Sequence, residues 1–275
     1  MKNHQKEINM FNSFDKRLVR RSFDQASRQY NQFTALQRTI GERLMSLAEN
    51  VDIAHDSLLD VGAGTGYLTH QLDKLFPQSD LFALDISAAM LQQTRQRMGA
   101  NNLQGLVCSD AELLAIKKLT LDRIYSNLAF QWCSQLSLVF SGSYQALKEQ
   151  GLFLFSTFGP DTLKELGSAW AAADDQVHIN DFMSAEQIKK ELEQAGFQTI
   201  QVLSEDIVLF YETPKQLMLE LKGMGAHNIN ATRKKGMTGT KAFSRMIQSY
   251  EKKRELNGLP ATFEAVYMMA RKQET

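Results

Sequence analysis

The sequence has little cysteine, little proline and no excess charge: its 275 residues include two cysteines, four prolines, 31 basic and 31 acidic residues. Two cysteines cannot build a disulfide framework, so we expect a reduced, cytoplasmic protein in which Cys108 and Cys133 are small buried apolar residues. The two lack metal-ligand spacing, and no metal is expected. The balanced charge provides no global attraction to nucleic acid or to an anionic membrane.

Long hydrophobic runs are also absent. No run approaches the ~18 apolar residues that a membrane span needs, and the polar segment 1–12 lacks the apolar centre of a signal peptide. Hydrophobic residues nevertheless make up 43% of the chain and charged residues 23%, as in ordinary globular proteins. We therefore expect a globular protein of one large domain or two small ones, without a membrane partner.

From residue 57 onward, short apolar runs alternate with helical patterns. Helical segments at 67–76 and 87–98 separate the first strands. This alternation predicts an α/β fold with a parallel sheet covered by helices on both faces. The predicted strands in this part of the chain are 57–61, 81–84, 105–108, 123–126 and 151–158.

Helical patterns also lie before and after this sheet. One covers 17–50, and others begin near Pro214 and Thr240, between extended segments at 198–211 and 261–271. The chain thus divides into an N-terminal helical segment (1–50), an α/β core (51–211 with 259–275) and a helical insert (212–258).

A glycine-rich loop follows the first predicted strand. Gly62, Gly64 and Gly66 alternate shortly after Asp60 and precede a helix, and glycine allows a tight turn and close approach of a ligand to the backbone. A plain turn is one alternative. A dinucleotide site is another, but its fingerprint requires glycine at the sixth position, where this chain has the bulky Tyr67. Asp60 is better explained by a cationic group, such as the ammonium of an amino acid.

Two further acids follow the next two strands. Asp85 ends the second strand, at the distance from Asp60 where ribose hydroxyls are typically bound. Asp110 follows the third strand and could accept a hydrogen bond from an adenine amino group, although either acid could instead cap the next helix. Because the carboxyl ends of parallel strands form the ligand edge of an α/β sheet, the three acids predict one nucleoside site.

This ordered series resembles that of the class I S-adenosylmethionine-dependent methyltransferases, over about residues 30–211 and the terminal strand. The resemblance implies a Rossmann-like fold: a seven-stranded, mostly parallel sheet with N-terminal helices and a helical insert before the last strand. It also implies S-adenosylmethionine as co-substrate. The residues implied are Asp60, Gly62, Gly64, Gly66 and Asn127 around the methionine part, Gln37 on its carboxylate, Asp85 on ribose, and Asp110 with Ala111 on adenine.

A closer resemblance depends on strings spread over most of the chain. They are Phe23-Asp24-Gln25-Ala26 with Tyr30, Asn127-Leu128-Ala129 with Gln131-Trp132-Cys133, and the segments 155–166 and 221–228. These strings resemble the malonyl-acyl-carrier-protein O-methyltransferases of biotin synthesis. That resemblance implies methyl transfer to the free carboxylate of a malonyl thioester, with the acidic malonyl-acyl-carrier protein as partner.

The candidate substrate contacts follow from the chemistry of a malonyl carboxylate. A malonyl carboxylate is ionised at neutral pH because ordinary carboxyl groups titrate near ~4, so no general base is required and positioning matters most. Tyr30 is the candidate catalytic residue, donating a hydrogen bond to that carboxylate; a half-buried surface tyrosine is the alternative. Trp132, Phe182, His227 and Asn228 are candidate substrate contacts, although core packing would also explain the two aromatic residues and solvation the loop histidine.

Basic residues are concentrated in the insert. Residues 214–254 contain ten lysines and arginines but two acidic residues, and complementary charge raises the encounter rate with an acidic protein. We therefore predict that the carrier protein docks at Arg233, Lys234, Lys235, Lys241 and Arg245. A solvated helix face is the alternative for such a run of charge.

Other functions share parts of this pattern. A methyltransferase for another small acid or a quinone precursor would have the same nucleotide residues and a different lid. A non-catalytic S-adenosylmethionine-binding scaffold would bind without turnover. A nucleic-acid methyltransferase would need a basic groove and an aromatic clamp for a flipped base. The chain has Asn127-Leu128-Ala129-Phe130 where an Asn/Asp-Pro-Pro-Tyr-like string is expected, so no nucleic-acid partner is predicted.

Overall fold

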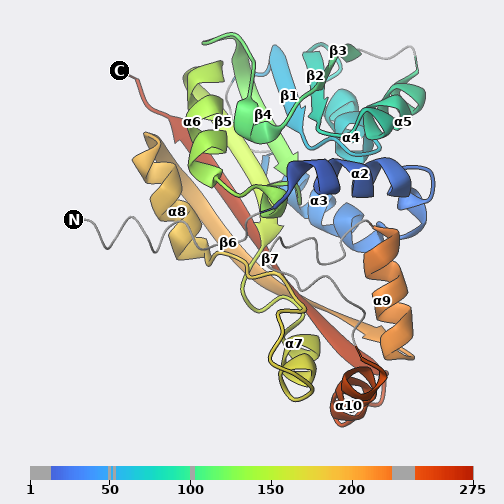
Figure 1. Ribbon diagram of the computed structural model, residues 1–275. Coiled ribbons are helices and arrows are strands. Elements are labelled where there is room, and N and C mark those ends of the chain that lie inside the picture. The colour runs from blue at the N-terminus through green and yellow to red at the C-terminus, as the bar shows by residue number, and fades with distance from the viewer. Residues whose placement is uncertain (1–13, 49–50, 52–53, 100–102, 225–238, 275) are drawn as a thin grey trace.

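The computed structural model describes residues 14–48, 51, 54–99, 103–224 and 239–274. Its centre is a seven-stranded sheet in the order β3-β2-β1-β4-β5-β7-β6 (Figure 1). Strands β1 to β5 run parallel, whereas β7 is antiparallel to both β5 and β6. The predicted seven-stranded, mostly parallel sheet is confirmed. The strands are β1 (Ser57–Val61), β2 (Asp80–Asp85), β3 (Leu103–Cys108), β4 (Leu121–Asn127), β5 (Leu147–Phe158), β6 (Phe197–Tyr211) and β7 (Leu259–Lys272).

The strand order reverses at the centre of the sheet. β1 pairs with β2 on one side and with β4 on the other, so the connections leave it in opposite directions. In open α/β sheets, ligands bind outside the carboxyl ends of the strands at such a reversal. The loop after Val61 and the last residues of β2 and β4 therefore lie at the edge where a ligand is expected.

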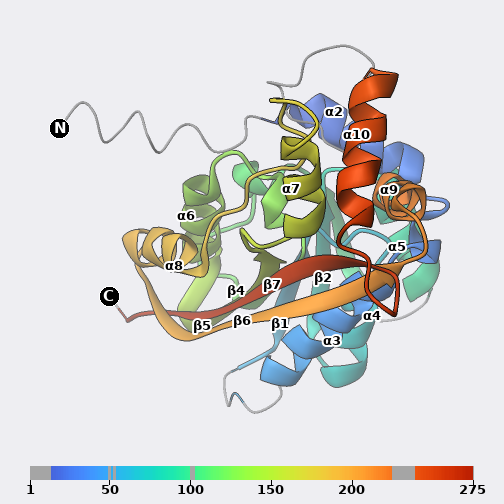
Figure 2. The same ribbon diagram turned by 90° about the horizontal axis from the view of Figure 1, so that it is seen from below.

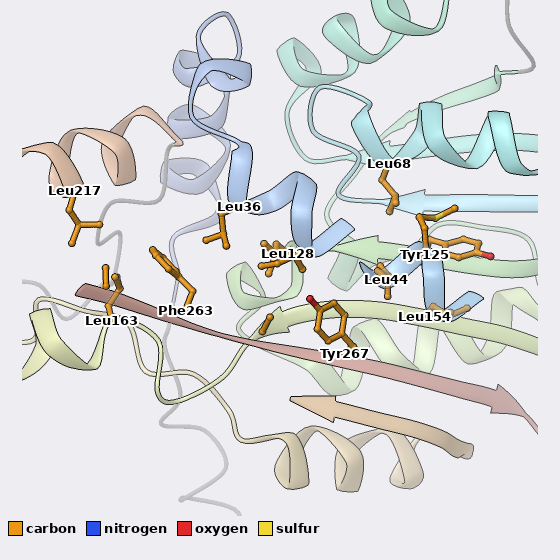
Figure 3. Close-up of a cluster of buried hydrophobic side chains, with 14 of the residues drawn as sticks. Leu36, Leu44, Leu68, Tyr125, Leu128, Leu154, Leu163, Leu217, Phe263 and Tyr267 are labelled. Atoms are coloured by element: carbon orange, nitrogen blue, oxygen red, sulfur yellow. The ribbon is translucent and has the colours of Figure 1, made fainter. Parts of the chain in front are cut away.

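Helices cover both faces of the sheet. They are α2 (Lys16–Ala26), α3 (Ala35–Ala48), α4 (Tyr67–Leu75), α5 (Ala88–Met98), α6 (Leu136–Ala146), α7 (Lys164–Ala171), α8 (Ala185–Gln194), α9 (Pro214–Gly223) and α10 (Thr240–Glu251). Leu152 and Leu154 of β5 join one hydrophobic cluster with α3, α4, α7, α9 and α10, part of which Figure 3 shows. Phe153 and Phe155 point the other way and join α6 and α8. Burial on both faces explains the nearly continuous apolar runs of the parallel strands.

The N-terminal helical pattern is interrupted. Where the sequence predicts a helical stretch over 17–50, the structure has α2 and α3 separated by the short 3-10 helix Tyr30–Gln32. Ser27 and Thr34 flank this break, and each hydroxyl donates to a backbone carbonyl three residues earlier. Such local hydrogen bonds compete with continuous helix. The break brings Tyr30 alongside the glycine-rich loop.

The last two strands form a long ladder that carries the insert. β6 and β7 pair from Phe197–Lys272 to Tyr211–Leu259, and α9 and α10 lie at the Tyr211–Leu259 end (Figures 1 and 2). On α10, the ring of Phe243 is 6.3 Å from that of Trp170 on α7. At the end of α9, Gly223 leaves room for the ring of Phe33, because a Cβ there would lie 2.5 Å from it. The insert therefore touches both α7 and the N-terminal segment.

The cysteines differ from expectation. Cys108 is exposed at the end of the edge strand β3, so the prediction that it is buried is wrong, and Cys133 is only partly buried. None of the residues Leu103–Cys108 of the edge strand β3 is fully buried, so the faces of this strand, with Cys108 at its end, are incompletely covered. Among the described residues, no helix is both long and apolar enough to cross a membrane.

Candidate active site at the carboxyl edge of the sheet

The glycine-rich loop makes a sharp turn after β1. Gly62, Gly64 and Gly66 have φ values of +76°, +56° and +78°, in the left-handed region that favours glycine. A Cβ on Gly62 would lie 2.2 Å from the Cβ of Ala129, and one on Gly66 would lie 2.9 Å from the Cα of Thr94. Glycine is therefore required here both for conformation and for space.

Asp85 connects this loop to helix α5. Its carboxylate accepts hydrogen bonds from the backbone N–H groups of Gly64, at 2.9 Å, and Ser87, at 2.8 Å. Burial raises the pKa of Asp85 to about 6, although the two backbone donors oppose the rise. The carboxylate therefore remains mostly ionised at neutral pH, as an acceptor of hydroxyl hydrogens must be.

Asp60 is buried beneath the same loop, with 1% of its surface exposed. One carboxylate oxygen accepts a hydrogen bond from Thr69 Oγ1 at 2.6 Å. The other, Oδ1, has no hydrogen-bond partner among the described residues. Burial raises the pKa of Asp60 to about 7. An adjacent cation would stabilise its charged form, so the geometry is compatible with the predicted contact to an ammonium group.

A lysine from α2 lies among the acids that follow β3. Lys16 Nζ is 2.7 Å from Glu112 Oε1 and 3.3 Å from Asp110 Oδ1, and it donates to the Trp132 carbonyl at 3.2 Å. Burial acts to lower the pKa of Lys16, but the surrounding acidic groups raise it above its usual value. Asp110, Glu112 and Cys133 are close enough together to ligate a metal ion. Here the lysine supplies positive charge to this cluster, and the absence of a metal stays a prediction.

These elements enclose a cavity, which we call the cofactor cavity. Its wall includes the predicted residues Gly62, Gly64, Asp85, Asp110, Ala111 and Asn127. Lys16, Phe23 and Tyr30 close it from the N-terminal segment. Hydrogen-bond acceptors thus stand at the ends of β2 and β3, beside a loop whose glycines allow close approach. The residues present fit a nucleoside with a short charged tail, such as S-adenosylmethionine.

Asn127 joins the sheet edge to the N-terminal helices. Its Nδ2 donates to the backbone carbonyl of Gln37 at 2.8 Å, and its Oδ1 accepts from Ser156 Oγ at 2.7 Å. Gly41 of α3 permits this approach, since a Cβ there would lie 3.1 Å from Asn127 Nδ2. The side chain of Gln37 contacts Met224 and lines a neighbouring cavity.

This neighbouring cavity, the apolar chamber, adjoins the cofactor cavity. The two share Phe23, Tyr30, Leu128 and Trp132. The predicted substrate contacts Tyr30, Trp132 and Phe182 all line the apolar chamber. Figure 3 shows four further or shared wall residues, Leu36, Leu128, Leu163 and Phe263, which come from α3, two loops and β7. The chamber is therefore assembled from segments far apart in the sequence.

A third cavity, the outer groove, lies beyond the apolar chamber. Gln131, Phe158 and Phe182 line both, and the rings of Phe158 and Phe182 are 5.8 Å apart. The groove also includes residues of α8, among them Gln187 and Lys190. The outer groove also shares Cys133 with the cofactor cavity, so the three cavities adjoin one another between the glycine-rich loop and the surface near α8.

Some predicted residues lie elsewhere. His227, Asn228, Arg233, Lys234 and Lys235 are outside the described residues, while Lys241 and Arg245 are exposed on α10. Sequence reasoning missed Lys16 at the cofactor cavity and Asn180 in the apolar chamber. Neither belongs to a motif or a periodic pattern, so no local signal marks them.

Comparisons with known proteins agree with this geometry. The family described as Methyltransferase domain matches residues 59–155. The YcgJ protein of Bacillus subtilis has a TM-score of 0.58 at 17% identity, over 84% of this chain and 98% of its own. Phosphoethanolamine N-methyltransferase 2 of Haemonchus contortus, solved with S-adenosyl-L-methionine, has a TM-score of 0.57 at 17% identity, over 91% of this chain and 57% of its own. At such identities the likeness establishes the fold, that of the Rossmann-like class I methyltransferases.

Sequence relatives are more specific. The malonyl-[acyl-carrier protein] O-methyltransferase of Nitrosospira multiformis is 38% identical over 97% of this chain and 92% of its own length. That of Gallionella capsiferriformans is 38% identical over 92% of this chain and 89% of its own. The biotin biosynthesis bifunctional protein BioHC of Teredinibacter turnerae is 37% identical over 94% of this chain, which spans 47% of that protein. The chain belongs to the malonyl-[acyl-carrier protein] O-methyltransferase family.

Proposed function

We propose that this protein transfers a methyl group from S-adenosylmethionine to the free carboxylate of a malonyl thioester held on an acyl-carrier protein, in biotin synthesis. One structural observation carries the proposal beyond family membership. The cofactor cavity, whose wall includes the charged Lys16, Asp85 and Asp110, and the apolar chamber share Tyr30 and Trp132. A methyl donor in the first and an acyl group in the second would meet at that shared wall.

The cofactor cavity, together with Asp60 beneath the glycine-rich loop, is proposed to supply a partner for each polar part of the donor, although Asp60 itself does not line the cavity. Asp85 accepts from the ribose hydroxyls, Asp110 with Ala111 contacts adenine, and the free oxygen of Asp60 pairs with the ammonium group. Bound in this way, S-adenosylmethionine supplies an electrophilic methyl carbon on a positively charged sulfur. Asn127 lies next to Gln37 at the methionine end, where its amide is held in one orientation by Ser156.

The reaction needs no general base. The malonyl carboxylate is already an anion near neutral pH: its oxygen bonds to the methyl carbon, the carbon–sulfur bond breaks with its electrons on sulfur, and no proton moves. Burial, with the nearby charge of Asp85, raises the pKa of Tyr30 well above its usual range. Tyr30 therefore keeps its proton at physiological pH and orients the carboxylate by donating a hydrogen bond.

The apolar surroundings favour this transfer. Opposite charges cancel as the methyl moves, and water stabilises the separated ions more than the neutralising transition state. Phe23, Trp132 and Phe182 line the apolar chamber, and the ring of Phe23 meets that of Trp132 edge to face at 5.6 Å. These rings exclude water from the reacting atoms.

The N-terminal segment is proposed as a cap over the site. It contacts the ends of three strands: Lys16 reaches Glu112 after β3, Asp24 accepts from Ser87 Oγ at 2.6 Å after β2, and Asn31 accepts from Thr65 Oγ1 at 2.7 Å after β1. The insert is proposed as the substrate lid, because the end of α9 supplies Leu221 and Met224 to the apolar chamber.

Mass spectrometry provides the decisive test. Malonyl-carrier protein incubated with the enzyme and S-adenosylmethionine should gain one methyl, which alkaline hydrolysis removes as expected of an ester. Acetyl-carrier protein, which lacks the free carboxylate, is the matched control and should gain none. Methylation of both carrier proteins, or of neither, would overturn the proposed function.

The carrier protein is proposed to dock on the helical insert. Lys241 and Arg245 are exposed on α10, and an acidic partner would be steered toward them. Reversing both charges should slow methylation of malonyl-carrier protein and weaken its salt dependence. Turnover of malonyl-coenzyme A should change much less. Equal losses on the two substrates would mean that these residues support the lid and do not recognise the carrier.

A further inference from the structure

Two of the residues that line the apolar chamber, Gln37 and Asn180, have side-chain amide oxygens that are buried. Gln37 Oε1 and Asn180 Oδ1 each lack a hydrogen-bond partner among the described residues. Both side chains line the chamber, whose wall is otherwise dominated by residues such as Leu36, Leu163 and Phe263. A buried acceptor without a donor costs free energy, so a bound molecule that brings an N–H group would be stabilised there.

The loop that carries Asn180 is held in place on both sides. Before it, the ring of His178 stacks on Trp170 at 3.6 Å, and its Nε2 is 2.8 Å from Asp174 Oδ1. After it, Phe182 packs against Phe158. The amide is therefore presented by a fixed segment, and little ordering is needed when a ligand binds.

The two oxygens lie at different ends of the apolar chamber, Gln37 near the cofactor cavity and Asn180 near the outer groove. The backbone carbonyl of Gln37 bonds to Asn127, which lines the cofactor cavity. Asn180 lies two residues from Phe182, which lines both the apolar chamber and the outer groove. A substrate with its carboxylate at Tyr30 and its tail toward the surface would pass Asn180 on the way out.

We propose that Asn180 Oδ1 accepts a hydrogen bond from the amide N–H of the thioester arm on which the malonyl group is delivered. The inference rests on the proposed function. The malonyl carboxylate and the thioester carbonyl are acceptors only, so neither can satisfy an amide oxygen. The arm of a carrier protein has a secondary amide a few bonds beyond sulfur, and its N–H is the first donor that the path would meet. Asn180 then fixes how deep the malonyl group enters.

The test compares two arms presented on the same carrier protein. In one arm the amide nearest sulfur is intact, and in the other an ester oxygen replaces its N–H, which removes the donor and keeps the shape. The wild-type enzyme should methylate the amide arm with a kcat/KM roughly tenfold or more above that of the ester arm. Asn180→Ala should lose this preference through a higher KM for the amide arm. Asn180→Asp keeps an acceptor, and should retain the preference even if its charge slows both reactions.

Two further variants complete the experiment. Gln37→Ala should leave the preference in place, and Gln198→Ala on the exposed strand β6 should change nothing. The melting temperature and cofactor affinity of Asn180→Ala should match wild type, which separates substrate contact from loop support. No preference in wild type, or an unchanged preference in Asn180→Ala, would overturn the inference while leaving methylation intact. If neither the amide arm nor the ester arm were methylated, the result would instead contradict the proposed function.

Discussion

The cofactor cavity and the apolar chamber share a wall but are built in opposite ways. The polar groups of the cofactor cavity come mainly from the ends of neighbouring strands, and their hydrogen bonds connect the sheet edge to other segments. Asp85 accepts from Gly64 and Ser87, and Asn127 donates to Gln37. The apolar chamber combines side chains from α3, the 3-10 region around Trp132, the loop before α8, α9 and β7. Two of its amide oxygens, on Gln37 and Asn180, receive no hydrogen bond from the part of the chain that the structure describes.

The two constructions suit two kinds of ligand, a nucleoside and an acyl chain. A nucleoside needs several hydrogen-bond partners in fixed positions, which a rigid sheet edge supplies. An acyl chain needs a dry, shaped space with few polar contacts, which separate elements can enclose by packing. Variants on the first side should therefore change folding and cofactor affinity, and variants on the second side should change the use of substrate.

The largest expected effect is on the glycine-rich loop. Gly62→Ala would place alanine in a left-handed backbone conformation and would also make its Cβ clash with Ala129. Together the two effects should destabilise the fold by about 3 kcal/mol. Gly99→Ala is a control for backbone strain without a clash, since Gly99 has φ +59° and ψ −121° and no described atom lies within 4 Å of the added Cβ. It should cost about 2 kcal/mol, the scale of a strained backbone conformation. Urea denaturation of both variants measures the difference, and similar losses would show that conformation alone requires glycine at position 62.

Cofactor affinity should depend on Asp85 and not on Phe182. Asp85→Ala removes a charged acceptor and should weaken S-adenosylmethionine binding by about 1–3 kcal/mol in calorimetry. Phe182→Ala should raise the KM for the malonyl thioester and leave cofactor affinity unchanged. If Phe182→Ala weakened the cofactor as much as Asp85→Ala, the two cavities would not be separable.

Asp60 should make cofactor affinity and stability respond oppositely to pH. The native pKa, raised to about 7 by burial, exceeds the ordinary value near 4, so the folded protein holds a proton between these pH values that the unfolded chain has lost. The stability linked to that proton is fully present below about pH 4 and is lost as pH rises through about 7. Cofactor binding should strengthen over the same rise in pH, because Asp60 ionises.

The variant Asp60→Asn tests both effects. It should bind the cofactor weakly, and its melting temperature should exceed that of wild type by more at pH 8 than at pH 5. Thermal melts and calorimetry at both pH values check this, and an unchanged cofactor affinity in the variant would contradict it.

The smallest effect concerns Tyr30, at the wall that both cavities share. Tyr30→Phe removes one hydrogen bond to the carboxylate and should lower kcat roughly tenfold. The kcat of wild type and variant should both stay nearly constant from about pH 6 to 8, because no base takes part. A single ionisation that controls kcat in wild type and disappears in the variant would show instead that Tyr30 transfers a proton.

The sheet and its glycine-rich loop could be predicted because they depend on short-range patterns. The strand predicted at 57–61 matches β1 (Ser57–Val61), and β7 (Leu259–Lys272) extends the segment predicted at 261–271. Burial on both faces produces apolar runs that can be recognised without knowledge of partners. The continuous helical pattern over 17–50 was less informative, because the competing hydrogen bonds of Ser27 and Thr34 leave the hydrophobic spacing intact.

The apolar chamber could be predicted only in part. Trp132 and Phe182 were candidates because of the family resemblance, and the structure brings both into one cavity with Tyr30. Asn180 was not predicted, since a single asparagine in a loop has no periodic or spacing signal and its importance depends on the neighbours that enclose it. Lys16 was missed for the same reason: its acidic partners lie more than ninety residues away in the sequence.

The three-point attachment of the cap has a consequence for the timing of turnover. Lys16, Asp24 and Asn31 bind the proposed cap to residues that follow three different strands. A hinge motion that broke one of these contacts would leave the other two in place. Release of spent co-substrate past the proposed cap would require several hydrogen bonds to break together, and we predict that this opening is slower than methyl transfer. With enzyme that already holds S-adenosylmethionine, the first turnover should accordingly appear as a burst of product. The slower steady-state rate that follows should equal the rate at which the cap opens.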